Sequence, residues 1–324
     1  MTRSLSTAVA LMIASPALAQ TPTLNIYAYD SFASEWGPGP AIEEAFEATC
    51  GCDLVFTGAG DGAALLSRLQ LEGPSSDADV VIGLDTDLVD AATKSGLFAP
   101  HGVTADLVLP VPFENETFLP FDWSYLAFVA GKDVPAVTSF RALADSDLSI
   151  VIQDPRSSTP GLAALMWVEA AYGDEAGAIW EGLADNIVTV TPGWTEAYNL
   201  FLEGEADAVL SYTTSPAYHL IAEDDDTKTS WAFDEGNYLQ VELAAKVAGT
   251  DQPELADRFM QFIVSDEFQS LIPTGNWSYP VTDVDLPDGF ETLTVPEKGL
   301  LMDPAEAAAL RPEALETWRT ALSR

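Results

Sequence analysis

Short apolar runs alternate with segments of helical periodicity from residue 24 onward. Strands are expected at 24–29, 53–56 and 79–84, and helices at 40–48, 63–71 and 88–95. Short strands separated by amphipathic helices are typical of βαβ units. The first third of the sequence therefore predicts an α/β fold with mostly parallel sheets.

A similar alternation restarts after Pro120. Strands are expected at 126–129, 149–153, 187–190, 208–212 and 238–247, and helices at 139–144, 160–172, 174–183 and 194–202. Because no flexible linker interrupts the pattern, we expect two closely packed lobes. In such sheets ligands bind beyond the carboxyl ends of the strands, so the strand-to-helix turns are candidate binding segments.

Several of these turns combine aromatic, hydroxyl and acidic side chains. Ser158 and Thr159 precede Pro160 at a helix start, where free N–H groups and hydroxyls can receive an anion. Trp194 and Trp277 lie in short polar turns, and their faces can stack on flat rings or attract cations at about 0.5–2 kcal/mol each. A plain helix cap and core-filling tryptophans would explain each feature singly. Their recurrence at successive turns favours a ligand site.

The N-terminus indicates export. Arg3, the short apolar run 6–15 and the small-x-small pattern ending at Ala19 predict a signal peptide of residues 1–19, cleaved after Ala19. The run is shorter than the roughly 20 residues that span a bilayer. We therefore expect a periplasmic protein whose remaining length suits two domains.

Charge and cysteine content narrow the function classes. The sequence has 13 basic and 51 acidic residues, a net charge of −38, which argues against nucleic acid and anionic membranes as partners. This charge would favour the approach of a cationic ligand, but an acidic surface that maintains solubility is the preferred explanation, so the charge is supporting evidence only. Cys50 and Cys52 predict a local disulfide that closes a very small loop. With only His101 and His219 as further partners, we expect no metal site at this pair.

Six segments resemble the family of thiamine-binding periplasmic proteins. They are YAYDSF (27–32), WGPGP (36–40), DPRSSTPGL (154–162), GWTEAY (193–198), LSYTTSPAYH (210–219) and IPTGNWSYP (272–280). The resemblance extends over essentially the whole chain after the signal peptide. It implies a type II periplasmic binding protein fold, with two α/β lobes joined by a two-strand hinge. The expected hinge strands are 118–129 and 238–247; residues 20–122 plus 243–324 form lobe 1, and residues 123–242 form lobe 2.

The resemblance also implies a function. The expected protein captures thiamine, or its mono- or pyrophosphate ester, between the lobes and delivers it to an inner-membrane ABC permease. It is expected to be a monomer without cofactor, metal or catalytic activity. The implied ligand-binding residues are Tyr29, Asp61, Gly62, Ser158, Thr159, Trp194, Tyr212, Thr213, Thr214, Ser215, Tyr218 and Trp277.

These residue types suit the chemistry of thiamine. Tyr and Trp faces can stack on the aminopyrimidine ring and attract the cationic thiazolium. Asp61 can pair with the cation or accept from the exocyclic amine. The hydroxyls of Ser158 and Thr159 can hold the hydroxyethyl tail or its phosphate.

Other classes of function remain open at this stage. A ferric-ion binder of the same fold would use residues such as Tyr212, Tyr218 and His219. A thiaminase-like enzyme would need a cysteine nucleophile from Cys50 or Cys52. The 58–63 segment fits a loose dinucleotide-binding pattern, but an acid inside that loop, Asp61, would repel pyrophosphate.

Overall fold

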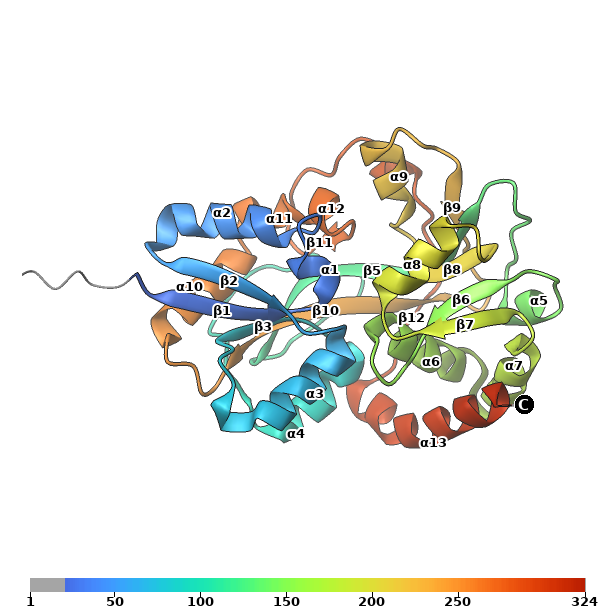
Figure 1. The fold of residues 1–324 in the computed structure, drawn as a ribbon, viewed down its shortest axis with the longest axis horizontal. Helices are drawn as coiled ribbons and strands as arrows, with labels where there is room; N and C mark the ends of the chain where they lie inside the picture. The colour runs from blue at the N-terminus through green and yellow to red at the C-terminus, as the bar shows by residue number, and fades with distance from the viewer. Residues whose placement is uncertain (1–20, 324) are drawn as a thin grey trace, which may run out of the picture.

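The computed structural model describes residues 21–323, and the predicted signal peptide lies outside this range. Two α/β lobes lie next to each other along the long axis of the molecule (Figure 1). The main strand order across both lobes is β2-β1-β3-β10-β5-β8-β6-β7. Within the described range, no helix has the length and apolar character needed to cross a bilayer.

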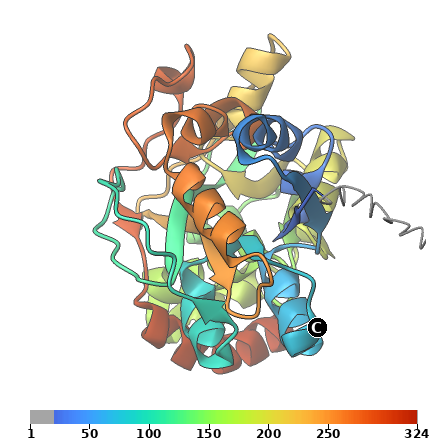
Figure 2. The ribbon, with the colours of Figure 1, turned by 90° about the vertical axis from the view of Figure 1, so that its left-hand side faces the viewer.

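The first lobe is a sheet with helices on both faces. Its parallel strands are β1 (Thr23–Ala28), β2 (Asp53–Gly58) and β3 (Val80–Asp85). Leu24 and Ile26 of β1 pack towards α2 (Gly39–Cys50) and α10 (Pro253–Ile263). Tyr27 packs on the opposite face, with α3 (Gly62–Glu72) and α4 (Val89–Ser95). Figure 2 shows this sheet enclosed between the two groups of helices, which explains why its strands are so apolar.

The second lobe repeats this plan. Its parallel strands are β6 (Ile150–Gln153), β7 (Ile187–Thr191) and β8 (Ala208–Tyr212). Its helices are α5 (Phe140–Ala144), α6 (Thr159–Tyr172), α7 (Ala176–Leu183), α8 (Trp194–Leu202) and α9 (Pro216–Ala222). Helix α6 is buried on all sides over its first ten residues, so it forms the centre of this lobe's core.

Two long strands connect the lobes. β5 (Phe118–Gly131) pairs with β10 (Asn237–Val247) in the first part of its length and with β8 in the second part. These strands confirm the expected crossings at 118–129 and 238–247. β10 is antiparallel to β3 and β5, and β5 is antiparallel to β8. The sheets are therefore parallel within each lobe and mixed where the lobes join.

The remaining elements are short, apart from the last helix. They are α1 (Asp30–Ala33), β4 (Phe98–Ala99), β9 (Lys228–Ser230), α11 (Asp266–Gln269), α12 (Ile272–Gly275), β11 (Tyr279–Pro280), β12 (Gly299–Leu300), α13 (Pro304–Leu322) and four 3-10 turns, at Gly73–Ser75, Thr86–Leu88, Gly173–Glu175 and Phe290–Thr292. α13 packs against α6 and α7 as well as α4, along the lower side of Figure 1. Part of the 243–324 segment thus also contacts the second lobe, and the division into lobes by residue number stays a prediction.

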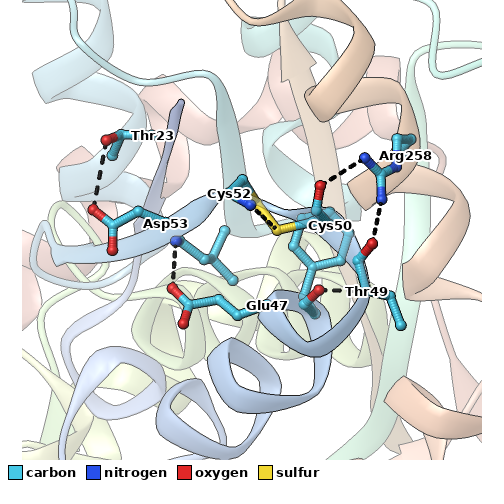
Figure 3. The surroundings of a disulfide bond; sticks show 9 residues. Thr23, Glu47, Thr49, Cys50, Cys52, Asp53 and Arg258 are labelled. Carbon is cyan, nitrogen blue, oxygen red and sulfur yellow. Dashed lines mark hydrogen bonds between the residues drawn. A yellow bond between two sulfur atoms is a disulfide. The ribbon is translucent and has the colours of Figure 1, made fainter. Parts of the chain in front are cut away.

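The two cysteines form a disulfide at the end of α2 (Figure 3). The Cys52 amide donates to Cys50 Sγ, and Arg258 of α10 donates to the carbonyls of Thr49 and Cys50. These contacts fix the C-terminus of α2 against α10. No free thiol is present in the described part of the chain, so the cysteine nucleophile needed by a thiaminase-like enzyme is missing there.

Candidate ligand-binding cleft

A cavity of about 510 Å³ lies between the two lobes. Seven aromatic side chains line it: Tyr29, Trp36, Trp194, Tyr198, Tyr212, Tyr218 and Trp277. Two carboxylates, Asp61 and Glu242, also face the cavity. None of the lining residues is Lys, Arg or His. The cavity therefore combines flat apolar walls with negative charge and suits an aromatic cation.

Eight of the twelve expected ligand-binding residues line this cavity. They are Tyr29, Asp61, Thr159, Trp194, Tyr212, Ser215, Tyr218 and Trp277. The other four, Gly62, Ser158, Thr213 and Thr214, are buried behind the wall. Ser124 shares a hydrogen bond with Thr214, Oγ to Oγ1 at 3.0 Å. Ser158 and Gly62 instead bond across the cleft.

The starts of helices converge on the cleft from both lobes. Asp61 is the N-cap residue of α3, yet its side chain makes no hydrogen bond to its own helix. Its Oδ2 accepts from Ser158 Oγ (2.7 Å) and from the amide of Trp194 (3.1 Å), which starts α8 in the other lobe. In return, Thr159 Oγ1 of α6 accepts from the Gly62 amide of α3 (2.8 Å). Each lobe thus caps a helix of the other, and the arrangement closes the cleft.

The interlobe hydrogen bonds of Asp61, Gly62, Ser158 and Thr159 form a clasp between the lobes. Burial changes the pKa of Asp61 at its centre. Desolvation raises the pKa of Asp61 to about 6, although the hydrogen bonds from Ser158 and Trp194 oppose the shift. Gly62 is required at its position because a Cβ there would lie 2.2 Å from the Gly83 carbonyl oxygen and 2.5 Å from Thr159 Oγ1. A larger residue at position 62 would therefore hold the lobes apart.

Two pairs of rings form the aromatic walls. Trp194 stacks on Tyr198 with ring centroids 4.9 Å apart, and Trp194 Nε1 donates to Ser211 Oγ at 2.8 Å. Tyr218 meets Trp277 edge to face at 5.4 Å. Trp277 has a φ of 55°, a backbone conformation that bulky residues rarely adopt. The position of its ring is thus retained despite local strain.

A network of polar side chains forms the floor of the cavity. The Tyr29 hydroxyl donates to Glu242 Oε2 (2.7 Å) and accepts from Asn276 Nδ2 (2.7 Å). Gln240 Nε2 donates both to Glu242 Oε1 (3.1 Å) and to the Tyr212 hydroxyl (3.0 Å). These bonds link α12 and both lobes through strand β10.

Sequence reasoning did not include Glu242 or Asn276 among the site residues. A signal was present for Glu242, because a single acid interrupts the apolar strand 238–247. Desolvation raises the pKa of Glu242 to about 7. Asn276 was within a quoted motif, but nothing in the sequence indicates that its amide faces Tyr29. Tyr198 was also in a quoted motif, and its ring extends the wall behind Trp194.

The residues of the ferric-ion alternative do not come together in the cleft. Tyr212 and Tyr218 line the cavity, but buried His219 does not. With a neutral ring, His219 Nδ1–H donates to Glu223 Oε2 (2.7 Å) and Nε2 accepts from the Tyr198 hydroxyl (2.9 Å). Desolvation raises the pKa of Tyr212 well above its ordinary value, which disfavours the tyrosinate that ferric ion needs. The potential ligand atoms of His219, Glu223 and Asp225 lie within 4.8 Å of one another, but none of the three residues lines the cavity, and Glu223 is exposed.

Comparison with known proteins agrees with this architecture. Residues 37–273 match the family model of the bacterial extracellular solute-binding proteins. The thiamine-binding periplasmic protein of Escherichia coli (strain K12) is 52% identical over 319 residues, which cover 97% of each chain. A solved periplasmic thiamin binding protein superposes with a TM-score of 0.92 over 96% of this chain and all of that chain, at 52% identity. The ferric binding protein from Campylobacter jejuni has the same fold, with a TM-score of 0.73 at 19% identity over 92% of this chain and 99% of that one.

Proposed function

The chain belongs to the family of bacterial extracellular solute-binding proteins, and from this premise we propose that it is the thiamine receptor of an ABC importer. It is a periplasmic protein with the two-lobed α/β architecture of type II binding proteins. The observation that carries the proposal is the interlobe cavity, which offers aromatic faces and carboxylates and has no basic lining residue. Thiamine combines a flat aminopyrimidine with a permanently cationic thiazolium, so its chemistry matches both features.

The twelve expected residues divide into three groups of proposed roles. The aromatic side chains Tyr29, Trp194, Tyr212, Tyr218 and Trp277 stack on the rings or cover them. The interlobe clasp consists of Asp61, Gly62, Ser158 and Thr159. Thr159 and Ser215 also line the cavity, where their hydroxyls can hold the hydroxyethyl tail or its phosphate. Thr213 and Thr214 are buried and support the turn from β8 to α9.

The proposed partner after capture is an inner-membrane permease. Closure of the lobes over the ligand would give the permease a shape that differs from the empty, open protein. The protein carries out no reaction on thiamine in this proposal, in agreement with relatives that are binding proteins. We propose a monomer as the binding unit, because both walls of the cavity come from one chain.

Calorimetric titration of the mature protein tests this function directly. The protein is first unfolded and refolded to remove carried-over ligand, and then titrated with thiamine. We expect tight one-to-one binding and an increase in the melting temperature. Titrations with thiamine monophosphate and pyrophosphate establish which esters the hydroxyl groups accept.

Ferric citrate provides the comparison with the alternative ligand. We expect no visible tyrosinate-to-iron absorption and no protection against heat. Absence of heat and of thermal shift with thiamine and both esters, together with an iron-dependent absorption band, would overturn the proposal in favour of a ferric-ion binder.

A further inference from the structure

Glu242 occupies an exceptional position on the hinge strand β10. It faces the cavity, and its two carboxylate oxygens accept hydrogen bonds from neutral donors, Oε2 from Tyr29 and Oε1 from Gln240. A half-buried carboxylate that lacks a positive partner is costly, because neutral hydrogen bonds replace only part of its hydration. Glu242 is therefore a group whose charge is incompletely compensated in the empty protein.

Two further acids lie directly beside Glu242 in the sheet. In the strand register, Glu242 is opposite Asp122 of β5 on one side and opposite Asp85 of β3 on the other. Like charges directly opposite each other on neighbouring strands destabilise a sheet. Both neighbours are buried, and each has a carboxylate oxygen, Asp85 Oδ2 and Asp122 Oδ1, without a hydrogen-bond partner within residues 21–323. Three acids thus form a row across the strands at the junction of the lobes.

Among the described residues, no positively charged side chain compensates this row at its cavity end. The titratable groups facing Glu242 are Tyr29 before α1, Asp122 on β5, Asp85 on β3, Asp61 at the start of α3 and Tyr212 on β8. Each is neutral when protonated and negative when deprotonated, so none can supply a positive charge. Arg311 of α13 acts on Asp85, at the other end of the row.

Asp61 is the other acid of the cavity, but its carboxylate already serves the interlobe clasp. One oxygen, Oδ2, receives both the Ser158 hydroxyl and the Trp194 amide. Glu242 has no such bond to the opposite lobe's backbone. Both acids have neutral donors, but Asp61 is bound to the opposite lobe, whereas Glu242 lies between Asp85 and Asp122 in the sheet, so Glu242 has the greater need of a positive partner.

We propose that Glu242 is the residue that selects for a fixed positive charge in the ligand, and that ligand binding expels a proton held between Glu242 and Asp122. This inference rests on the proposed function and specifies the charge selectivity of the same cavity. A thiazolium next to Glu242 supplies the missing positive charge, whereas a neutral ring of the same shape leaves the acid uncompensated.

The proton follows from the same geometry. In the empty protein, burial and mutual repulsion favour a shared proton on the Glu242–Asp122 pair, and their pKa values are raised accordingly. A cation at Glu242 lowers the pKa of the pair, and the proton leaves to the solvent. Affinity for the cation should therefore rise with pH, by up to about tenfold per unit below about pH 7. Asp61, whose pKa is also raised, adds a smaller dependence near pH 6.

The test compares thiamine with deazathiamine, its neutral thiophene isostere, on the wild-type protein and on Glu242→Gln. We expect the wild type to bind thiamine at least about thirtyfold more tightly than the neutral isostere. In Glu242→Gln this ratio should fall to within about threefold of unity, mainly through loss of thiamine affinity. Calorimetry at about pH 6.5 in two buffers of different ionisation enthalpy should show proton release in the wild type and little in the variant.

Two further variants make the outcome specific. Asp122→Asn keeps Glu242 and should retain the preference for charge while releasing fewer protons. Glu196→Gln removes an exposed acid of α8 outside the cavity lining and should leave the ratio unchanged. If the wild type binds neither compound, the proposed function fails; if it binds thiamine but Glu242→Gln keeps the same charge preference, only the role of Glu242 fails. A melting temperature for each variant separates these results from misfolding.

Discussion

At the scale of single residues, Trp277 shows a conflict between backbone and side chain. Its φ of 55° suits glycine, and a bulky residue there costs on the order of 1–3 kcal/mol. Its ring contacts Tyr218 and packs beside Phe290 and Leu293. Because the ring also lines the cavity, we interpret the strained conformation as the means of holding an aromatic face towards the ligand.

Substitution of Trp277 separates these two effects. Trp277→Ala and Trp277→Gly both remove the ring, and we expect each to weaken thiamine binding by about tenfold, the loss of one stacking or cation–π contact. Only glycine relieves the backbone strain, so Trp277→Gly should melt at a higher temperature than Trp277→Ala. Titration calorimetry and thermal melting measure the two quantities. Equal melting temperatures would show that the backbone conformation is not strained.

At the scale of elements, local patterns were sufficient for much of the fold. The helix 194–202 and the strand 208–212 have the predicted bounds, since the turn residues on either side define their ends. Short elements such as β11 and β12 were not predicted, because long-range pairing with β5 and β10 produces them. Glu242 was missed for a related reason: its neighbours are set by strand register across more than a hundred residues of sequence.

The starts of helices α3, α6 and α8 explain why the turn motifs did indicate the cleft. Residues suited to capping a helix occur at each start, and Asp61 and Thr159 use this chemistry between lobes instead of within one helix. When the cleft opens, water has to replace the hydrogen bonds at the Trp194 and Gly62 amides. Closure is thus coupled to the capping of two helices.

Asp61→Asn tests this coupling. The amide group keeps the size of the side chain, and its Oδ1 can still accept from Ser158 and the Trp194 amide, but it lacks the negative charge that strengthens both bonds. We expect thiamine affinity to fall by about tenfold or more, mainly through faster dissociation, and the liganded protein to be more open. Stopped-flow dissociation and small-angle scattering with saturating thiamine measure these effects.

A control comes from the other end of α8. Glu203→Gln makes the same change in charge at the C-cap of α8, but Glu203 is exposed, does not line the cavity and does not act on Asp61. It should leave both dissociation and shape as in the wild type. Equal effects of the two substitutions would indicate that general attraction of the cation, not the clasp, accounts for the loss.

At the scale of the whole molecule, negative charge is concentrated both on the surface and at the lobe junction. With a net charge of −38 at pH 7, the ionised acids of the surface repel one another, and salt screens this repulsion. The buried acids at the junction are a separate contribution. Burial raises the pKa of Asp87 and Glu242 to about 7 and that of Asp61 to about 6, and salt does not reach these groups easily.

These raised pKa values predict an unusual dependence of stability on pH. An acid whose pKa is higher in the folded than in the unfolded chain stabilises the fold below its unfolded pKa, and this stability is lost as the pH rises through the folded pKa. The free energy of unfolding of the ligand-free protein should thus be lower at about pH 8 than at about pH 5.5, by about 2 kcal/mol or more.

Denaturant unfolding at both pH values, in low salt and in about 1 M NaCl, measures this difference. If the buried acids cause the decline in stability, it persists in high salt and becomes smaller in Glu242→Gln and Asp87→Asn. A decline that high salt removes would arise from the surface charge and would contradict the assignment to buried acids. Saturating thiamine should also reduce the decline, because a cation in the cleft stabilises the ionised Glu242 that high pH produces.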